Sequence, residues 1–263
     1  MTNNSFLEGL FGLDGQTAVV IGGTGVLGGA ICEGLAKAGA SVVVSGRSEE
    51  RGQQRVSGIV SAGGKAIFAP VDVAQSSSLE ALKSRSLEVG AGTVEILVNC
   101  AGVNSATPYE EIKEEEWDRV VDGNLKATHL ACQAFAPMMS EQANGGSILN
   151  IGSVTAHLPL SKVYAYSASK AAVVNLTQNL AREFAKKNVR LNTLCPGFFP
   201  AEQNRKILTA ERVENIMSQT PMARFGETDE LIGAVLLLCS RNAGGFITGA
   251  SYYVDGGFTA MRF

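Results

Sequence analysis

A tyrosine and a lysine placed four residues apart are the side chains of this sequence best suited to proton transfer. They are Tyr166 and Lys170, in the segment Tyr-Ser-Ala-Ser-Lys. On a helix, residues at this spacing lie on the same face, so the phenol and the ammonium group are neighbours. A nearby cation favours the phenolate and lowers the pKa of tyrosine from its usual value of about 10. The spacing therefore predicts a general acid or base.

A serine hydroxyl is expected to complete this site. Ser153 follows the run Ser147–Ile151, which is typical of a buried strand. The carboxyl ends of parallel strands form the ligand-binding crevice of a sheet, so Ser153 is placed to hold a substrate oxygen. The Tyr-x-x-x-Lys spacing alone is common in helices, and the prediction depends on the motifs that accompany it.

A glycine-rich turn near the start of the chain predicts a phosphate site. It follows the strand-like run Thr17–Ile21, precedes the helical pattern Val26–Ala38 and contains a Gly-x-Gly-x-x-Gly sequence. This context places backbone N–H groups at a helix N-terminus, where a pyrophosphate binds. The residues expected to bind a dinucleotide here are Gly22, Gly23, Thr24, Gly25, Val26, Leu27 and Gly28.

The end of the second predicted strand favours NADP(H). An NAD site usually carries an Asp or Glu about 20 residues beyond the glycines, where it binds the adenosine ribose. Here Ser45 is followed by Gly46, Arg47 and Ser48, with no carboxylate. An arginine between hydroxyls can make charge-assisted bonds to a 2′-phosphate, so Ser45 and Arg47 are assigned to the cofactor. NAD(H) stays open as the alternative if Arg47 is only a solvated surface residue.

Short apolar runs alternate with helical patterns along the whole chain. This alternation predicts a Rossmann-type α/β fold, a doubly wound parallel sheet of seven strands with helices on both faces. We expect a single domain over residues 1–263, with a substrate lobe or lid at 198–225 and a short tail at 1–15. The expected strands are Thr17–Ile21, Ser41–Ser45, Ala66–Val73, Glu95–Cys100, Ser147–Ile151, Arg190–Cys195 and Ser251–Val254. The expected helices are Val26–Ala38, Glu49–Ser61, 76–90, 114–140, 164–187 and 228–240.

These motifs occur together with Asn99-Cys100-Ala101-Gly102, Asn124 and Pro196-Gly197. In this combination the sequence resembles a single-domain short-chain dehydrogenase/reductase over essentially its whole length. The resemblance implies that Tyr166 exchanges a proton with the substrate oxygen, which Ser153 positions. It implies that Lys170 lowers the pKa of Tyr166 and holds the nicotinamide ribose. Asn124 is expected to anchor a water that links Lys170 to solvent.

The resemblance also assigns the remaining cofactor contacts. Asp72 and Val73 are expected at the adenine, and Asn99, Ala101 and Gly102 at the adenosine side. The segment Pro196, Gly197, Phe198 and Phe199 is expected at the nicotinamide amide. Three positions depart from the usual family pattern: Val26 replaces a glycine, Ile21 a threonine and Cys100 an asparagine. A threonine that often follows Pro-Gly is also missing.

The substrate class follows from a closer likeness. The segments Gly22–Gly29, Pro196–Phe199, Glu202–Arg205 and Thr220–Glu227 resemble a branch that acts on sugar acids, of the D-mannonate/fructuronate and gluconate 5-dehydrogenase type. A sugar acid needs a cation for its carboxylate and polar groups for its hydroxyls. The expected substrate contacts are Asn104, His157, Lys162, Gln203, Asn204 and Arg205. A 3-oxoacyl thioester reductase and a non-catalytic NADP(H)-binding regulator stay open as alternatives.

Composition excludes several other classes. The 263 residues include 22 Lys and Arg against 25 Asp and Glu, a net charge of −3, so no basic surface for nucleic acid or anionic membranes is expected. Apolar runs are shorter than the roughly 20 residues that span a bilayer. Two histidines and five separated cysteines suit neither a metal centre nor disulfides and indicate a cytoplasmic protein. The resemblance implies a homotetramer with contacts through the helices 114–140 and 164–187.

Overall fold

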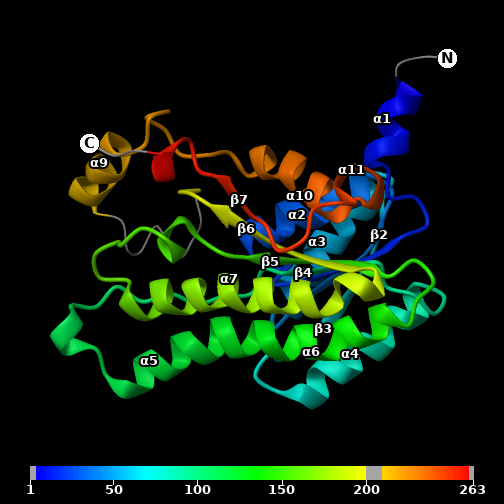
Figure 1. Ribbon diagram of the computed structural model, residues 1–263, viewed down its shortest axis with the longest axis horizontal. Helices are drawn as coiled ribbons and strands as arrows, with labels where there is room; N and C mark the ends of the chain where they lie inside the picture. The colour runs from blue at the N-terminus through cyan, green and yellow to red at the C-terminus, as the bar shows by residue number, and fades with distance from the viewer. Residues whose placement is uncertain (1–3, 200–208, 261–263) are drawn as a thin grey trace.

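Seven parallel strands form one sheet in the order β3-β2-β1-β4-β5-β6-β7 (Figure 1). The computed structural model describes residues 4–199 and 209–260. The strands are β1 Thr17–Ile21, β2 Ser41–Gly46, β3 Lys65–Pro70, β4 Ile96–Asn99, β5 Gly146–Ile151, β6 Val189–Pro196 and β7 Ser251–Val254. The predicted fold class is confirmed, because the sheet is parallel throughout and helices cover both faces.

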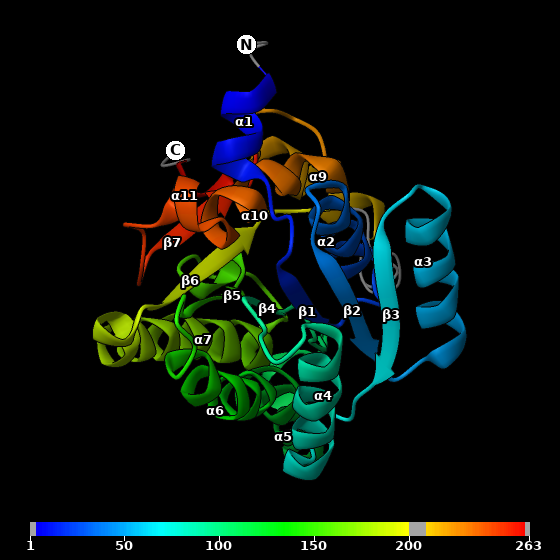
Figure 2. The same cartoon turned by 90° about the vertical axis from the view of Figure 1, so that its right-hand side faces the viewer.

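Helices connect the strands and cover the two faces of the sheet in separate groups (Figure 2). On one face lie α2 Val26–Lys37, α3 Glu49–Ser61 and α10 Ile232–Cys239. On the other lie α4 Ser76–Val89, α6 Ala127–Ser140 and α7 Tyr164–Phe184, with α5 Glu114–Val121 leading into α6. The remaining helices are α1 Asn4–Phe11, α9 Ala210–Ser218 and the short α11 Arg241–Gly244.

The central strands are apolar along their whole length because both of their faces are buried. In β1, Val20 packs under α2 and α10, whereas Val19 packs against the helices of the opposite face. This alternation follows from the two-residue period of a strand. The sheet order reverses between β1 and β4, which pair with Ile21 opposite Asn99. Such a switch point opens a crevice at the carboxyl ends of the strands.

Four predicted elements differ in the structure. The predicted N-terminal tail forms helix α1, whose end is tied to α11 because Ser240 Oγ donates a hydrogen bond of 2.7 Å to the Leu10 carbonyl. Strand β3 ends at Pro70 and not at Val73, since Asp72 begins a turn in which its Oδ1 accepts a bond from the Ala74 N–H. The predicted helix 114–140 is interrupted by a π-helical turn, Asp122–Lys126.

The predicted helix 228–240 also divides, into a 3₁₀ turn at Thr228–Leu231 followed by α10. None of the helices in residues 4–199 and 209–260 combines the length and apolar character that crossing a membrane requires. Gln203, Asn204 and Arg205, three of the predicted substrate contacts, lie outside the described residues.

Candidate active site

The glycine-rich turn folds tightly against the neighbouring strand ends. Gly22 has a φ of +91°, and a Cβ there would lie 2.6 Å from the Ala101 nitrogen. A Cβ at Gly28 would collide with the Gly22 carbonyl, so both positions require glycine. Gly25 is the N-cap of α2 and offers no side chain, which leaves the first N–H groups of the helix without a side-chain acceptor. This turn presents backbone donors to an anionic ligand.

A cavity of about 520 Å³ lies over this helix N-terminus and reaches the predicted catalytic pair. It brings together six of the seven predicted turn residues with Cys100, Gly102, Tyr166 and Lys170. It also contains residues of α3 that the motifs did not single out. The lining is Gly22, Thr24, Gly25, Val26, Leu27, Gly28, Glu33, Arg51, Gln54, Arg55, Gly58, Cys100, Gly102, Ile151, Tyr166 and Lys170.

Several predicted cofactor residues lie beside this cavity and do not line it. Ser45 is buried, and its hydroxyl donates a 2.7 Å bond to the Ala69 carbonyl of β3. The Asn99 amide is buried as well and donates to Asn150 Oδ1 at 2.8 Å, within the network under β5 and α7. Gly23 is buried beneath the turn, and a Cβ there would press on Cys32. Arg47 is exposed after the carboxyl end of β2.

The other adenosine-side predictions also fall around the carboxyl edge of the sheet. The Asp72 carboxylate is held within its own turn, because it accepts bonds from the Ala74 N–H and the Gln75 amide. Val73 packs against the core under α4, and Ala101 abuts Gly22. These residues follow the ends of β3 and β4, so they border the crevice even though their side chains serve local contacts.

Tyr166, Ser153 and Lys170 meet at the end of β5. The hydroxyl of Ser153 hydrogen-bonds with the Tyr166 phenol and accepts bonds from the Thr155 N–H and hydroxyl at 3.2 and 3.1 Å. The Lys170 Nζ lies 5.6 Å from the centroid of the Tyr166 ring. It donates a 2.7 Å bond to the Ile151 carbonyl, two residues before Ser153. The predicted proximity of the three groups is present in the structure.

The pKa values of this pair differ from the sequence expectation. Burial raises the pKa of the Tyr166 phenol to about 12, and the hydrogen bond from Ser153 acts in the opposite direction. Burial lowers the pKa of Lys170 to about 8, against the opposing influence of Cys100 and Cys195. We expected the lysine to lower the tyrosine pKa, but burial is the largest influence on the pKa of the phenol in this structure. Tyr166 is therefore a protonated phenol at neutral pH.

Asn124 occupies the π-helical turn and fastens two segments of the site. Its Oδ1 accepts a 2.7 Å bond from the Val103 N–H, and its Nδ2 donates to the Val103 carbonyl and to Ser169 Oγ. Ser169 in turn donates to the Tyr166 carbonyl at 2.7 Å. A Cβ at Gly102 would lie 3.1 Å from Asn124 Oδ1 and 3.6 Å from Lys170 Nζ, so the three are neighbours.

A second, smaller cavity of about 150 Å³ adjoins the first at Tyr166, Ile151 and Leu27. Its wall contains Ser153, the predicted substrate contact Asn104 and the whole predicted nicotinamide segment from Pro196 to Phe199. Neither His157 nor Lys162 lines it. The exposed His157 ring packs edge-on against Tyr253 at 5.6 Å, and the Lys162 carbonyl accepts a bond from the Thr107 N–H.

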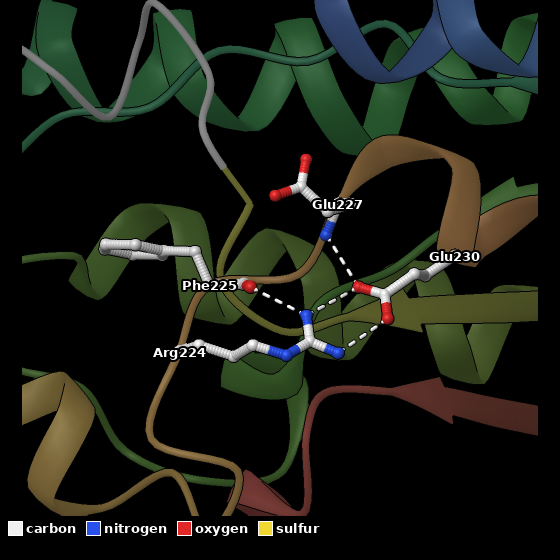
Figure 3. Close-up of polar contacts among 4 residues, drawn as sticks. All are labelled: Arg224, Phe225, Glu227 and Glu230. Carbon is white, nitrogen blue, oxygen red and sulfur yellow. Dashed lines mark hydrogen bonds and ion pairs between the residues drawn. The ribbon is translucent and has the colours of Figure 1, made fainter.

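The segment Thr220–Glu227, which resembles the sugar-acid branch, forms a loop that packs against this wall, a contact that its sequence alone did not predict. The Gly226 N–H donates to the Phe198 carbonyl at 3.0 Å, and a Cβ at Gly226 would lie 2.5 Å from the Phe199 ring. Figure 3 shows the ion pair within this loop: the Arg224 guanidinium donates hydrogen bonds to both carboxylate oxygens of Glu230. The Glu230 carboxylate also accepts a bond from the Glu227 N–H. Glycine at 226, within Ala-Arg-Phe-Gly-Glu, is the sequence signal for this close approach.

A dinucleotide-type crevice with a buried tyrosine, lysine and serine where two cavities meet defines an NAD(P)-dependent oxidoreductase. Comparison with known proteins agrees. A family model described as enoyl-(acyl carrier protein) reductase matches residues 24–259. Gluconate 5-dehydrogenase of Gluconobacter oxydans is 34% identical, over 95% of this chain and 97% of its own length. The chain belongs to the short-chain dehydrogenase/reductase family, which confirms the resemblance drawn from the motifs.

Solved structures match the fold closely. A gluconate 5-dehydrogenase from Burkholderia cenocepacia, solved in complex with NADP and tartrate, superposes with a TM-score of 0.91 at 32% identity. The match covers 97% of this chain and 100% of that one. A short-chain type dehydrogenase/reductase from Mycobacterium marinum gives 0.91 at 31% identity, covering 96% and 98% of the two chains.

Proposed function

We propose that this protein is an NADP(H)-dependent oxidoreductase that interconverts a ketone and a secondary alcohol on a sugar acid or a related polyol. One observation carries the proposal: Tyr166 lines both the large cavity over the glycine turn and the small cavity beside Ser153. A proton donor in the wall between a dinucleotide site and a substrate site reaches the oxygen of a carbonyl held against the nicotinamide.

The large cavity fits a dinucleotide. The N-terminus of α2 carries no acidic side chain in its first turn and no side-chain cap, so its N–H groups suit a pyrophosphate. A Cβ at Gly22 or Gly28 would collide with neighbouring backbone atoms, so the tight turn requires glycine at both positions. This requirement supports a role of the turn in binding phosphate through its backbone. NADP(H), when bound, would supply or accept the hydride. Arg47 at the end of β2, without a nearby carboxylate in Ser45–Ser48, favours the phosphorylated form.

Residues of the protein transfer the proton to and from the substrate oxygen. Tyr166, a protonated phenol at neutral pH, donates its Oη proton to the carbonyl oxygen during reduction and takes a proton back during oxidation. The Ser153 hydroxyl accepts bonds from Thr155, so its own hydrogen can be donated either to the phenol or to an incoming substrate oxygen. Lys170, which donates a hydrogen bond to the Ile151 carbonyl, adds positive charge beside the site and would hold the nicotinamide ribose. Asn124, through Val103 and Ser169, fixes the surrounding backbone.

The substrate class rests on the likeness to gluconate 5-dehydrogenases and on the polar wall of the small cavity. Asn104, Ser153 and Thr155 line that cavity and can bind hydroxyl groups of a sugar. Two cations that could bind the carboxylate of a sugar acid are associated with the loop before α7. Lys162 lies in the loop that precedes α7, and Arg212 of α9 donates a 2.8 Å bond to the Ser161 carbonyl of that same loop.

The test is a substrate panel with both cofactors, followed by nicotinamide absorbance. D-gluconate, 5-keto-D-gluconate, D-mannonate, D-fructuronate, simple polyols and a 3-oxoacyl thioester would each be assayed with NADP(H) and NAD(H). Turnover of a sugar acid or its keto form with NADP(H) is the expected result. Turnover of the thioester alone, or cofactor binding without any turnover, would favour the reductase or regulator alternatives instead.

We also propose a cytoplasmic homotetramer. Five free cysteines, four of them buried, suit a reducing compartment. Trp117 on α5 and Tyr164 at the start of α7 are more than a third exposed, and these helices pack side by side on one face of the molecule (Figure 1). Exposed aromatic residues on such a surface suit a contact between copies. Light scattering of the purified protein would test this, and a monomer would contradict it.

A further inference from the structure

We propose that Thr155 is a positioning residue that makes the Ser153 hydroxyl a donor, and not an acceptor, toward the reacting oxygen. The inference rests on the proposed function and adds a residue to its mechanism. It begins from the strand end that carries Ser153, between β5 and the short 3₁₀ turn Val154–Ala156. Ser153, Thr155 and Tyr166 all line the small cavity of about 150 Å³.

The backbone around Ser153 is held by the neighbouring strand β6. The Gly152 N–H donates a 2.7 Å bond to the Leu194 carbonyl, and the Ser153 N–H donates to the Cys195 sulfur. A Cβ at Gly152 would lie 2.8 Å from that sulfur, so the two strands approach closely at this point. Because the backbone is fixed, the remaining freedom of Ser153 is the direction in which its hydroxyl donates and accepts.

Thr155 supplies two donors to the one hydroxyl oxygen of Ser153. Its N–H lies 3.2 Å from Ser153 Oγ, and its own hydroxyl donates to the same atom at 3.1 Å. A serine hydroxyl has one hydrogen to donate and two lone pairs that accept. Both lone pairs of Ser153 are therefore occupied. The hydrogen is what Ser153 has left to offer to the Tyr166 phenol or to a substrate oxygen.

The two bonds from Thr155 have different origins. Ser153 is the N-cap of the 3₁₀ turn, so the bond from the N–H would form with any residue except proline at position 155. The bond from the hydroxyl requires serine or threonine there. Thr155 is only 8% exposed, so water does not readily replace its hydroxyl. The contribution of the side chain can therefore be removed by valine, which keeps nearly the same shape and lacks the donor.

The direction of the Ser153 hydroxyl decides where the Tyr166 proton can go. The hydrogen bond from Ser153 lowers the pKa of Tyr166, which is the effect of a donor to the phenol oxygen. A serine with an empty lone pair could instead accept the phenol hydrogen and hold it away from the substrate. With both lone pairs filled, the phenol keeps its proton for the carbonyl oxygen. Ser153 then donates a second bond to that oxygen as negative charge develops on it.

Steady-state reduction at pH 7 tests this, with NADPH and the keto acid that the substrate panel identifies, for which 5-keto-D-gluconate is the first probe. Thr155→Val removes the hydroxyl donor, and Thr155→Ser keeps it. Thr17→Val is the matched control, because Thr17 is a buried threonine at the amino end of β1, at the opposite edge of the sheet. We expect Thr155→Val to lower kcat by about 3- to 10-fold, as the loss of one hydrogen bond implies. Thr155→Ser and Thr17→Val should match the wild type.

A double-mutant cycle separates this role from a direct contact with the substrate. Ser153→Ala alone should lower kcat by about 100-fold, the effect of removing a donor to the developing oxyanion. Because Thr155 acts through Ser153, adding Thr155→Val to Ser153→Ala should change kcat by less than about twofold. An equal loss in both backgrounds would show that Thr155 acts independently and would overturn the proposal. A rise in KM alone, or an unchanged kcat in Thr155→Val, would also overturn it.

Two further measurements keep the outcomes distinct. Urea unfolding of each variant shows whether a loss of kcat reflects a damaged fold, and Thr155→Ala, which also lacks the hydroxyl, replaces a valine variant that does not fold. A loss of kcat in Thr155→Ser as large as in Thr155→Val would show that the methyl group matters and not the hydroxyl, which would overturn the proposal. A wild type that turns over no member of the panel would instead refute the proposed function itself.

Discussion

The Lys170 ammonium donates a 2.7 Å hydrogen bond to the carbonyl oxygen of Ile151, the last residue of β5. The lysine is thereby tied to the strand that leads to Ser153, while Tyr166 is carried on the same helix as the lysine. One strand end thus sets the positions of the acid, the hydroxyl that bonds to it and the cation beside them. The geometry is a property of the β5–α7 unit.

Replacing Tyr166 by phenylalanine should abolish most turnover and leave cofactor binding intact. The change removes the Oη proton and the bond with Ser153 but keeps the ring between the two cavities. A loss of about 10²- to 10⁴-fold in kcat is expected for removal of a general acid. Steady-state kinetics and NADPH titration measure the two effects. The control is Tyr164→Phe, because Tyr164 is an exposed tyrosine two residues before Tyr166 on the same helix. Undiminished turnover in Tyr166→Phe would refute the mechanism.

The raised pKa of Tyr166 predicts opposite pH dependences in the two directions. With a pKa of about 12, the phenol stays protonated across the neutral range and can act as an acid without adjustment. Carbonyl reduction should therefore proceed at pH 6 to 8, whereas alcohol oxidation, which needs a proton acceptor, should accelerate as pH rises. Profiles of kcat in both directions would show this. Reduction that required alkaline pH would contradict the assignment of Tyr166 as the acid.

Lys170 should make the unfolding free energy depend on pH in a defined window. Its pKa falls from 10.5 to about 8 on folding because burial disfavours the charged form. Between these values the unfolded chain holds more of the proton, so stability contributed by this group rises with pH. The unfolding free energy of the wild type relative to Lys170→Met should rise from pH 8 to 10, by at most about 1.4 kcal/mol per pH unit.

Urea unfolding of the ligand-free proteins under reducing conditions, at pH 7.5, 8.5 and 9.5, would give this difference. The comparison with the variant cancels the contributions of buried thiols that do not interact with Lys170, such as Cys132, whose pKa burial raises to about 12. A difference that stayed level or fell over this range would show that Lys170 is not desolvated as the structure implies.

Replacing Asn124 by alanine should cost stability as well as activity. The side chain satisfies both backbone groups of Val103 and bonds to Ser169, so its loss leaves buried polar groups without partners. The expected loss in unfolding free energy is about 2–4 kcal/mol. Chemical denaturation measures it, with Asn175→Ala on the exposed side of α7 as the control. An Asn124→Ala protein with wild-type stability but low kcat would indicate that the residue acts only through a bound water.

Gly226→Ala should disturb the substrate cavity without touching the catalytic groups. The new methyl would lie 2.5 Å from the Phe199 ring and push the Phe198–Phe199 wall inward. We expect a rise of roughly tenfold in the KM for substrate, since the cavity holds only about 150 Å³. Gly233→Ala is a matched control, because a Cβ there meets nothing within 4 Å. Equal KM values in Gly226→Ala and Gly233→Ala would show that the loop held by the Arg224–Glu230 ion pair does not shape the substrate cavity.

Much of the site could be predicted because it depends on local spacing. The Tyr-x-x-x-Lys pair needs only a helix to become neighbours, and the glycine turn needs only a strand before it and a helix after it. The predicted strand ends then bring Ser153 to the same edge. These relationships follow from the periods of helix and strand and from the parallel sheet order.

The parts that could not be predicted depend on contacts between segments distant in sequence. Nothing near Ser45 or Asn99 indicates that their side chains bond to Ala69 and Asn150 and not to a ligand. The pKa of Tyr166 depends on how deeply the completed fold buries it. Arg55 resembles any solvated helix residue until the packing of α3 against α2 places it on Gly29 and beside Glu33.

The π-helical turn at Asp122–Lys126 constrains the length of this part of the chain. A wide turn of this kind contains one residue more than an α-helical turn, so α5 and α6 are rotated against each other by about 100° relative to a continuous helix. Removing a single residue from it would restore a regular helix and turn the buried face of α6, with Cys132, Phe135 and Met139, away from the sheet. A one-residue deletion in this segment would therefore leave either Asn124 or the α6 core misplaced.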